Sequence, residues 1–168
     1  IEISYHPFGK DVKSVTISPY HLKQYNNRWF LIGKKYNFES LSNFAIDRIE
    51  GIKEIGRAKY ELLDDDFDFE EFFEDVVSVS VEDVPVEDVV IYANEKVFNY
   101  IFTKPLHESQ IIKREVLPDG RREIDLKVKD NYELRALLRS FGSQIEVIKP
   151  ESLRNKMKEN ALVLSKMY

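Results

Sequence analysis

Tyrosine, histidine, tryptophan and arginine side chains concentrate in the first third of the chain, between residues 17 and 49. Hydroxyl and imidazole groups can hydrogen-bond a ligand, aromatic rings can stack on a nucleobase, and guanidinium groups can pair with an anion. Their clustering around one turn and one strand end indicates a site for an anionic ligand. We predict that six residues form it: Tyr20, His21, Tyr25, Arg28, Trp29 and Arg48.

The aromatic members of this set also have structural interpretations. Tyr20 and Tyr25 are equally consistent with packing in a barrel wall, where each hydroxyl group would reach a polar partner. Trp29 and Phe30 are neighbours on one strand, so their side chains point to opposite faces and one of them should be buried. We expect Trp29 to belong to the core rather than to a ligand platform.

The charged members raise a similar choice. Arg48 follows Asp47 at a strand end, so it is either a cation directed at a ligand or half of an ion pair with Asp47 or Glu50. Arg28 and Lys34 bracket a short hydrophobic strand, and for Lys34 we favour a solvated strand end. The residues alone leave the alternatives for Arg48 open.

Other kinds of chemistry find no support. His6, His21 and His107 are widely separated, without the paired spacing of a zinc site. The alternating aspartates of residues 64–68 have Phe69 where a calcium loop requires Gly. No P-loop and no nucleophile motif is present. We therefore expect no metal, no cofactor and no enzymatic activity.

Composition indicates a folded, soluble protein of one domain or two small ones. The chain has 168 residues, of which 43% are hydrophobic and 33% charged. It contains no Cys, no apolar run long enough for a membrane helix and no signal peptide, so we expect a cytoplasmic protein. Because it begins at Ile1 rather than Met, we expect a fragment or a processed form, which allows for domains upstream.

Charge is unevenly distributed along the chain. Residues 1–60 carry a net charge of +4, residues 61–85 carry −11 and residues 86–168 carry +2. A local basic face can attract phosphate groups even though the whole chain carries −5. The acidic block has Phe residues at helical spacing, so we expect residues 63–85 to be a docked linker with a short helix. Its carboxylates are most simply a solvated face; contact with the basic barrel or mimicry of DNA is the alternative.

Five short strands are predicted in the first 62 residues, which is typical of a small, strongly bent β-barrel. Pro19 interrupts the second strand, so residues 20–25 should be irregular or extended. Asn26 and Asn27 should form a tight turn, because Asn tolerates a positive φ. The predicted strands span residues 1–8, 12–18, 28–34, 40–46 and 52–62.

Residues 86–168 follow a βαββαβ order with a final helix, the pattern of a ferredoxin-like domain. Asn94 should cap the first helix, Asp130 or Asn131 the second, and Gly142 should end the second. The predicted strands span residues 86–92, 109–117, 122–128 and 144–148, with a hairpin turn at 118–121, and the helices span 95–102, 132–141 and 151–166. The predicted class is α+β, with domains at 1–62 and 86–168 joined by the linker 63–85.

The stretch 17–49 resembles the signature of the WYL-domain family. The resemblance rests on P-Y-H-L at 19–22, R-W-F-L-I-G at 28–33 and F-A-I-D-R-I at 44–49, and residues 86–168 resemble the C-terminal extension that often follows. The chain departs from the family pattern at three positions: Phe30 replaces a Tyr, and Ser42 and Ala45 replace residues that are Arg in many members.

The resemblance implies an Sm-like, SH3-type barrel that senses ligands in bacterial transcription regulators. It also implies an upstream helix-turn-helix domain, absent from these residues, and some relatives sense single-stranded DNA. We therefore predict a regulatory module that binds an anionic ligand, such as single-stranded DNA or RNA, and relays binding to that domain. The ferredoxin-like domain would carry homodimer contacts or transmit the ligand signal. The alternatives are a stand-alone nucleic-acid-binding accessory protein and a purely structural dimerisation module.

Overall fold

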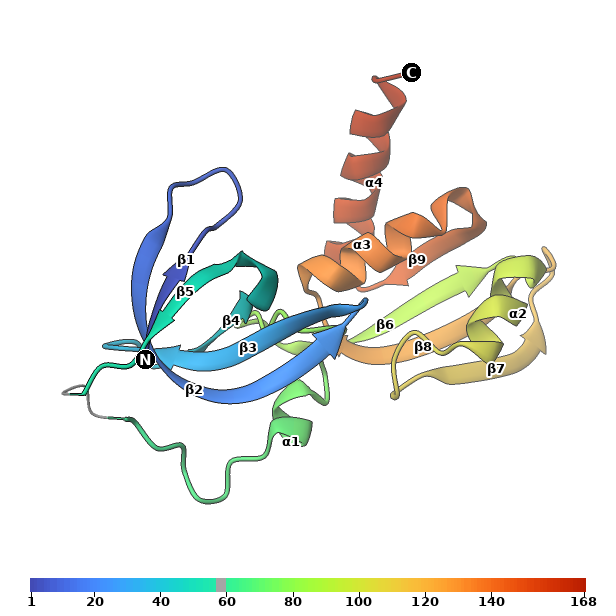
Figure 1. The fold of residues 1–168 in the computed structure, drawn as a ribbon. Coiled ribbons are helices and arrows are strands. Elements are labelled where there is room, and N and C mark those ends of the chain that lie inside the picture. The colour runs from blue at the N-terminus through green and yellow to red at the C-terminus, as the bar shows by residue number, and fades with distance from the viewer. Residues whose placement is uncertain (57–59) are drawn as a thin grey trace. The chain divides into compact units, whose positions relative to one another are not determined.

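The computed structural model describes residues 1–168 except 57–59. The chain divides into two compact units, residues 1–72 and 73–168. The described residues form two antiparallel sheets, one in each unit, and four α-helices (Figure 1). The α+β class is therefore confirmed, whereas the Sm-like and ferredoxin-like descriptions stay predictions.

The first unit is a five-stranded antiparallel sheet with the strand order β4-β3-β2-β1-β5. Its elements are β1 (Glu2–Tyr5), β2 (Lys13–Tyr25), β3 (Arg28–Lys35), β4 (Leu41–Ala45), the 3₁₀-helix η1 (Ile46–Arg48) and β5 (Ile49–Lys53). Ile3, Ile17 and Phe44 form a buried cluster, against which Leu31 and other partly buried side chains pack. Burial of each large side chain contributes roughly 1.5–3 kcal/mol to the stability of this sheet.

Strand β2 is longer than the sequence predicts, because it continues through Pro19. Its register against β3 shifts between Pro19 and His21, so a local irregularity takes up the proline without ending the ladder. Gly33 faces this point, where an added Cβ would lie 2.8 Å from the Ser18 carbonyl oxygen. Residues 20–25 are therefore regular strand rather than an irregular segment.

The turn between β2 and β3 is the predicted one. Asn26 and Asn27 have φ values of 47° and 60°, as a two-residue hairpin requires. The predicted strand at 52–62 is wrong: β5 starts at Ile49 and ends at Lys53, and residues 54–56 and 60–62 are not strand. Ile49 donates its N–H to the Ile46 carbonyl, which closes η1 and lets strand pairing with β1 begin earlier than predicted. Residues 57–59 of that prediction lie outside the described residues.

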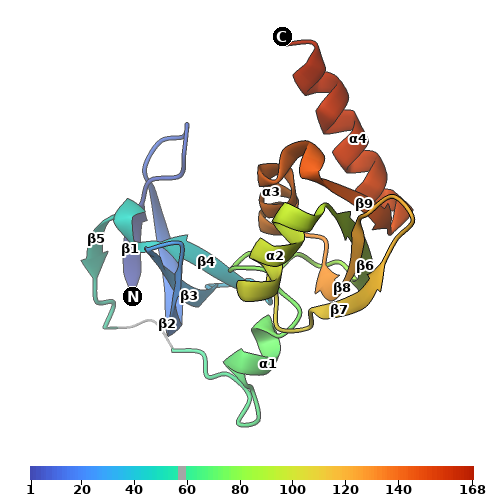
Figure 2. The same cartoon turned by 90° about the vertical axis from the view of Figure 1, so that its right-hand side faces the viewer.

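The second unit is a four-stranded antiparallel sheet with the strand order β7-β8-β6-β9. Its elements are β6 (Val86–Ala93), α2 (Glu95–Thr103), β7 (Ile111–Val116), β8 (Arg122–Lys129), α3 (Tyr132–Ser140), the 3₁₀-helix η2 (Gly142–Gln144), β9 (Ile145–Lys149) and α4 (Glu151–Ser165). Helices α2 and α3 cover one face of the sheet, and α4 extends away from it (Figure 2). The main core lies between those two helices and the sheet, with alternate residues of β6 and β8 fully buried.

Local signals in this half are confirmed. Asn94 and Asn131 cap α2 and α3, each accepting a backbone N–H three residues further on. Gly142 has φ of +59° just after α3, where a left-handed residue ends a helix. The acidic block contains the short helix α1 (Phe69–Phe73). No helix among the described residues has both the length and the apolar character of a membrane span.

Candidate ligand-binding site

Arg48 is the centre of a cluster of cationic and aromatic groups in the first unit. Its guanidinium carbon lies 3.3 Å from the centroid of the Phe8 ring, a close cation–π contact. Its Nε is buried and has no hydrogen-bond partner in the part of the chain that the structure describes. Arg48 forms no ion pair with Asp47 or Glu50 among the described residues, so the structure leaves its charge without a carboxylate partner.

Arg28 joins the same cluster from the start of β3. Its guanidinium carbon is 5.9 Å from the Phe8 ring centroid, and its Nε and Nη2 donate to one oxygen of Asp47 at 3.0 and 2.5 Å. These hydrogen bonds, together with the charge of Arg48, hold the pKa of the Asp47 carboxyl below its usual value. Among the described residues, only Arg28 pairs with Asp47, so a cluster of two guanidinium groups and one carboxylate has a net positive charge.

Local structure determines where these groups lie. The Asn26–Asn27 turn places Arg28 opposite Tyr25 in the β2–β3 ladder. The turn of η1 places Asp47 and Arg48 between β4 and β5, and the Arg48 carbonyl accepts the His6 N–H at 3.0 Å. Phe8 follows β1 in a turn and is 72% exposed, so its ring faces solvent apart from the arginines.

Trp29 does not belong to the core, contrary to the prediction. It is 47% exposed, while Phe30 on the opposite face is partly buried. Trp29 and Leu31 lie on the same face of β3, and Leu31 packs against the cluster of Ile3, Ile17 and Phe44. Trp29 lies two residues nearer the β2–β3 turn and is therefore beyond that cluster. An exposed indole at this position is free to stack on a ligand. Tyr25 is partly buried.

Tyr20 lies against the segment that follows β5. Its hydroxyl group donates to the Glu61 carbonyl at 2.7 Å, and its ring meets that of Tyr60 edge-on at 5.7 Å. Burial is the main cause that raises the pKa of Tyr20. The Glu61 carboxylate pairs with Lys34 Nζ at 2.8 Å and raises the pKa of that lysine. Lys34 is therefore paired rather than a solvated strand end.

His21 is covered by an aromatic ring from the acidic block. The Phe69 ring stacks on the imidazole with centroids 4.4 Å apart and planes 15° apart. Phe67 in turn contacts Phe69 edge-on at 4.9 Å. Four of the six predicted residues thus fall into two groups: Arg28 and Arg48 meet at Phe8, whereas Tyr20 and His21 contact the acidic block. Tyr25 and Trp29 belong to neither group.

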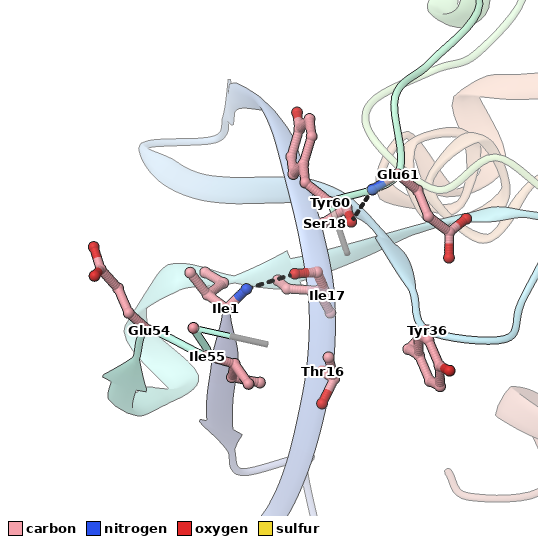
Figure 3. A pocket seen from close by; sticks show the side chains of 10 residues that line it. Ile1, Thr16, Ile17, Ser18, Tyr36, Glu54, Ile55, Tyr60 and Glu61 are labelled. Carbon is pink, nitrogen blue, oxygen red and sulfur yellow. Dashed lines mark hydrogen bonds between the residues drawn. The ribbon is translucent and has the colours of Figure 1, made fainter. Parts of the chain in front are cut away.

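A separate cavity of about 230 Å³ opens beside β2 (Figure 3). Its lining consists of Ile1, Thr16, Ile17, Ser18, Tyr36, Glu54, Ile55, Gly56, Tyr60 and Glu61. None of the six predicted residues contributes to it. Because this lining has two carboxylates and no Lys or Arg, the cavity does not suit an anionic ligand.

Sequence reasoning missed Phe8, Glu61 and Phe69 as members of these clusters. Phe8 did carry a local signal, since an aromatic residue between Pro7 and Gly9 is placed in a turn and tends to be exposed. Glu61 and Phe69 carried none, because they reach β2 from about 40 residues away in sequence. No group of three or more potential metal ligands lies together among the described residues.

Comparison with known proteins agrees with the family resemblance. A family model of the WYL domain matches residues 1–54, and a model of the WCX domain matches residues 85–163. A search of curated proteins found no match. Among solved structures, the chain is similar to proteasome accessory factor B/C (PafBC) of Arthrobacter aurescens, with 15% identity and a TM-score of 0.40. That match covers 93% of this chain and 23% of the PafBC chain.

The two domain models together account for most of the sequence, in the order that the motifs predicted. The chain belongs to the WYL-domain family and consists of a WYL domain followed by a WCX domain.

Proposed function

We propose that this chain is the ligand-sensing regulatory module of a bacterial transcription factor. A WYL domain followed by a WCX domain is the domain pair of such a module. The first unit, as an Sm-like barrel, binds an anionic ligand. The second unit, as a ferredoxin-like domain, carries the homodimer contacts. Ligand binding is relayed to a helix-turn-helix domain upstream of these residues.

The observation that carries this proposal is the unpaired guanidinium group of Arg48. A buried Nε without an acceptor costs stability in a free protein, on the order of 1–3 kcal/mol for an unsatisfied polar group. Such a cost is removed when an anion supplies the acceptor. The exposed Phe8 ring holds the guanidinium group in place, so Arg48 loses little conformational freedom when the ligand binds.

Arg28 is suited to change partners. It is held by the exposed carboxylate of Asp47, and an exposed ion pair contributes only about 0–1 kcal/mol. A phosphate group can therefore replace Asp47 at little cost. Binding of a phosphate between Arg28 and Arg48 would leave Asp47 beside the ligand, which favours ligands that present a donor next to the phosphate.

Single-stranded nucleic acid is the ligand class that fits this surface best. Single strands combine spaced phosphates with bases that can stack on aromatic side chains, and each stacked base contributes about 1–3 kcal/mol. Trp29 is exposed on the strand that begins with Arg28, and Phe8 is exposed between the arginines. A phosphate on the arginines would lie on the Phe8 side of this surface. Trp29, the strand neighbour of Arg28, points to the opposite face of β3, so it would stack on a base of a more distant nucleotide.

The test is the binding of labelled single-stranded DNA and RNA oligonucleotides, followed by fluorescence anisotropy across a salt series. Arg48→Ala should weaken binding at least about tenfold, as loss of a charge-assisted hydrogen bond worth about 1.5–3 kcal/mol predicts. The slope of log K against log salt should also fall by about 0.7, the value for one phosphate contact with a single strand.

The matched control is Arg114→Ala, which removes the same charge from an exposed arginine of β7. If both variants weaken binding equally, the effect is one of net charge and the assigned contact is wrong. If the wild-type protein binds no oligonucleotide at low salt, single-stranded nucleic acid is excluded as the ligand.

A dimerisation module is the second candidate, favoured by the exposed apolar residues at the end of α4. Leu162, Val163, Leu164 and Met167 are each at least half exposed. A dimer formed through this end should dissociate in the variant Leu162→Glu, measured by sedimentation equilibrium. Normal regulation by a protein carrying Arg48→Ala, with loss of regulation in Leu162→Glu, would favour dimerisation as the whole function.

A further inference from the structure

Residues 60–72 lie along the part of β2 that contains Tyr20 and His21, and we call this segment the acidic strap. It contains seven acidic residues and no Lys or Arg. Between Tyr60 and Phe72 it contacts four consecutive residues of β2, from Ser18 to His21. Two of the six predicted ligand residues, Tyr20 and His21, are therefore in contact with the acidic strap.

Glu61 anchors one end of the strap through three groups. Its N–H donates to Ser18 Oγ at 3.0 Å, and its carbonyl accepts from the Tyr20 hydroxyl group. Its carboxylate pairs with Lys34 at 2.8 Å. The charged Glu61 oxygen thus lies beside a lysine, as a phosphate oxygen would, whereas Tyr20 and Ser18 bind the Glu61 backbone.

Phe69 anchors the other end. Its ring is nearly parallel to the His21 imidazole at 4.4 Å, as a stacked nucleobase would be. Phe67 and Phe72 pack against Phe69, with ring centroids 4.9 and 6.4 Å away. The carboxylates of the strap remain at the surface, since Asp64, Asp65, Asp66, Asp68, Glu70 and Glu71 are all exposed.

We propose that the acidic strap is an internal competitor that occupies a second ligand subsite, formed by Ser18, Tyr20, His21 and Lys34, and that a single-stranded nucleic acid displaces it. The Glu61 carboxylate stands in for a phosphate, and the Phe69 ring stands in for a base. This inference rests on the proposed function, which it deepens: the arginine cluster gives the first contact, and the subsite under the strap gives further contacts once the strap leaves.

The contacts of the strap suit a segment that opens. The strap is held by hydrogen bonds to Ser18, Pro19 and Tyr20, one ion pair and one ring stack, each of them individually weak. It adds no strand to the sheet, so it can leave without unfolding the first unit. The apparent dissociation constant of a ligand for the subsite equals the intrinsic value divided by the open fraction. Weakening the strap must therefore tighten binding.

The experiment compares binding of a labelled single-stranded oligonucleotide to the wild-type chain and to the double variant Glu61→Gln, Phe69→Ala. The matched control is Phe38→Ala with Glu39→Gln, which removes one exposed ring and one charge from the β3–β4 turn. The strap variant should bind at least about fivefold more tightly than the control, as a mostly closed strap implies. Its salt slope should rise by about 0.7, because Lys34 becomes available to a phosphate.

A second measurement detects directly whether the strap is in contact with His21. The ring protons of His21 should shift in the NMR spectrum when Phe69→Ala removes the stacked ring. Addition of the oligonucleotide to the wild-type chain should move the same resonances away from their positions in the free protein.

The outcomes separate this inference from the proposed function. Binding by the wild-type chain, with no gain in the strap variant over the control, overturns the strap and leaves the proposed function intact. Binding by the strap variant alone shows that the strap blocks the subsite, but it overturns both displacement of the strap by single-stranded nucleic acid and the proposed ligand class. No binding by any variant at low salt overturns both.

Discussion

The side chain of Asn131 makes more contacts than a helix cap requires, and this gives a sharp prediction. It is fully buried, with an exposed fraction of 0%. Its Oδ1 accepts the Leu134 N–H at 2.8 Å and caps α3. Its Nδ2 donates to the carbonyls of Val77 and Ser80 at 2.8 and 3.0 Å, which ties residues 77–80 to the start of α3.

Asn94 provides a matched comparison, because its Oδ1 caps α2 through Val97 and no donor contact of its Nδ2 is present among the described residues. Asn94→Ala should therefore cost about 1 kcal/mol, the usual value of a lost cap. Asn131→Ala loses a cap and also leaves the buried Val77 carbonyl without its donor, at about 1–3 kcal/mol, so its cost should be about 2–4 kcal/mol.

Aspartate variants isolate the donor contacts. Asp retains the capping oxygen, so Asn94→Asp should leave stability nearly unchanged. Asn131→Asp places a carboxylate against the Val77 and Ser80 carbonyls and should lose about as much stability as Asn131→Ala.

Unfolding in urea can be followed separately for the two units. Far-UV circular dichroism at the helical band reports mainly the second unit, which contains α2, α3 and α4, whereas fluorescence reports the first unit through Trp29. The loss in Asn131→Asp should appear in the dichroism signal. Equal stability of Asn131→Asp and Asn94→Asp would refute the reasoning, because the Nδ2 contacts would then contribute nothing.

Three further predictions concern other features. Gly33→Ala should destabilise the first unit by about 1–3 kcal/mol in urea, because the new methyl group meets the Ser18 carbonyl at 2.8 Å, whereas Gly51→Ala, with a nearest contact of 3.6 Å, should not. Burial lowers the pKa of His107 below 6.5 in the folded protein. The neutral imidazole therefore contributes its full stability above pH 6.5, and this contribution is lost as the pH falls through the folded pKa. His107→Gln should remove this pH dependence from the free energy of unfolding in urea. Trp29, the only Trp, should emit at the wavelength of a solvated indole and be quenched by iodide, and a blue emission would show that it is buried after all.

Features that depend on a few adjacent residues were predictable from the sequence. The Asn26–Asn27 turn, the caps at Asn94 and Asn131 and the positive φ of Gly142 all follow from side chains that act on their own backbone. Periodicity and turn residues likewise located the strands and α-helices of the second unit to within about two residues, because most of these elements bury one face on a single core.

Predictions failed where tertiary packing decides between local alternatives. Alternation along β3 shows that Trp29 and Phe30 face opposite ways, but not that the core ends before Trp29 is reached. Pro19 normally ends a strand, but here a shift of register and the close approach of Gly33 allow β2 to continue. The site residues were predicted as one set, and nothing local showed that distant residues of the acidic strap contact two of them.

This division of the candidate site has a consequence for regulation. Arg28 and Arg48 meet at Phe8, whereas Tyr20 and His21 contact the strap, so substitutions of an arginine and of a strap residue should act on binding with opposite signs. Under the proposed function, loss of Arg48 removes a contact to the ligand. Loss of a strap residue removes a contact that only the free protein uses. A small anion can bind the arginines alone. Only a longer nucleic acid, which supplies both a phosphate and a base, can take the place of Glu61 and Phe69. Displacement of the strap would therefore select for nucleic-acid polymers over small metabolites.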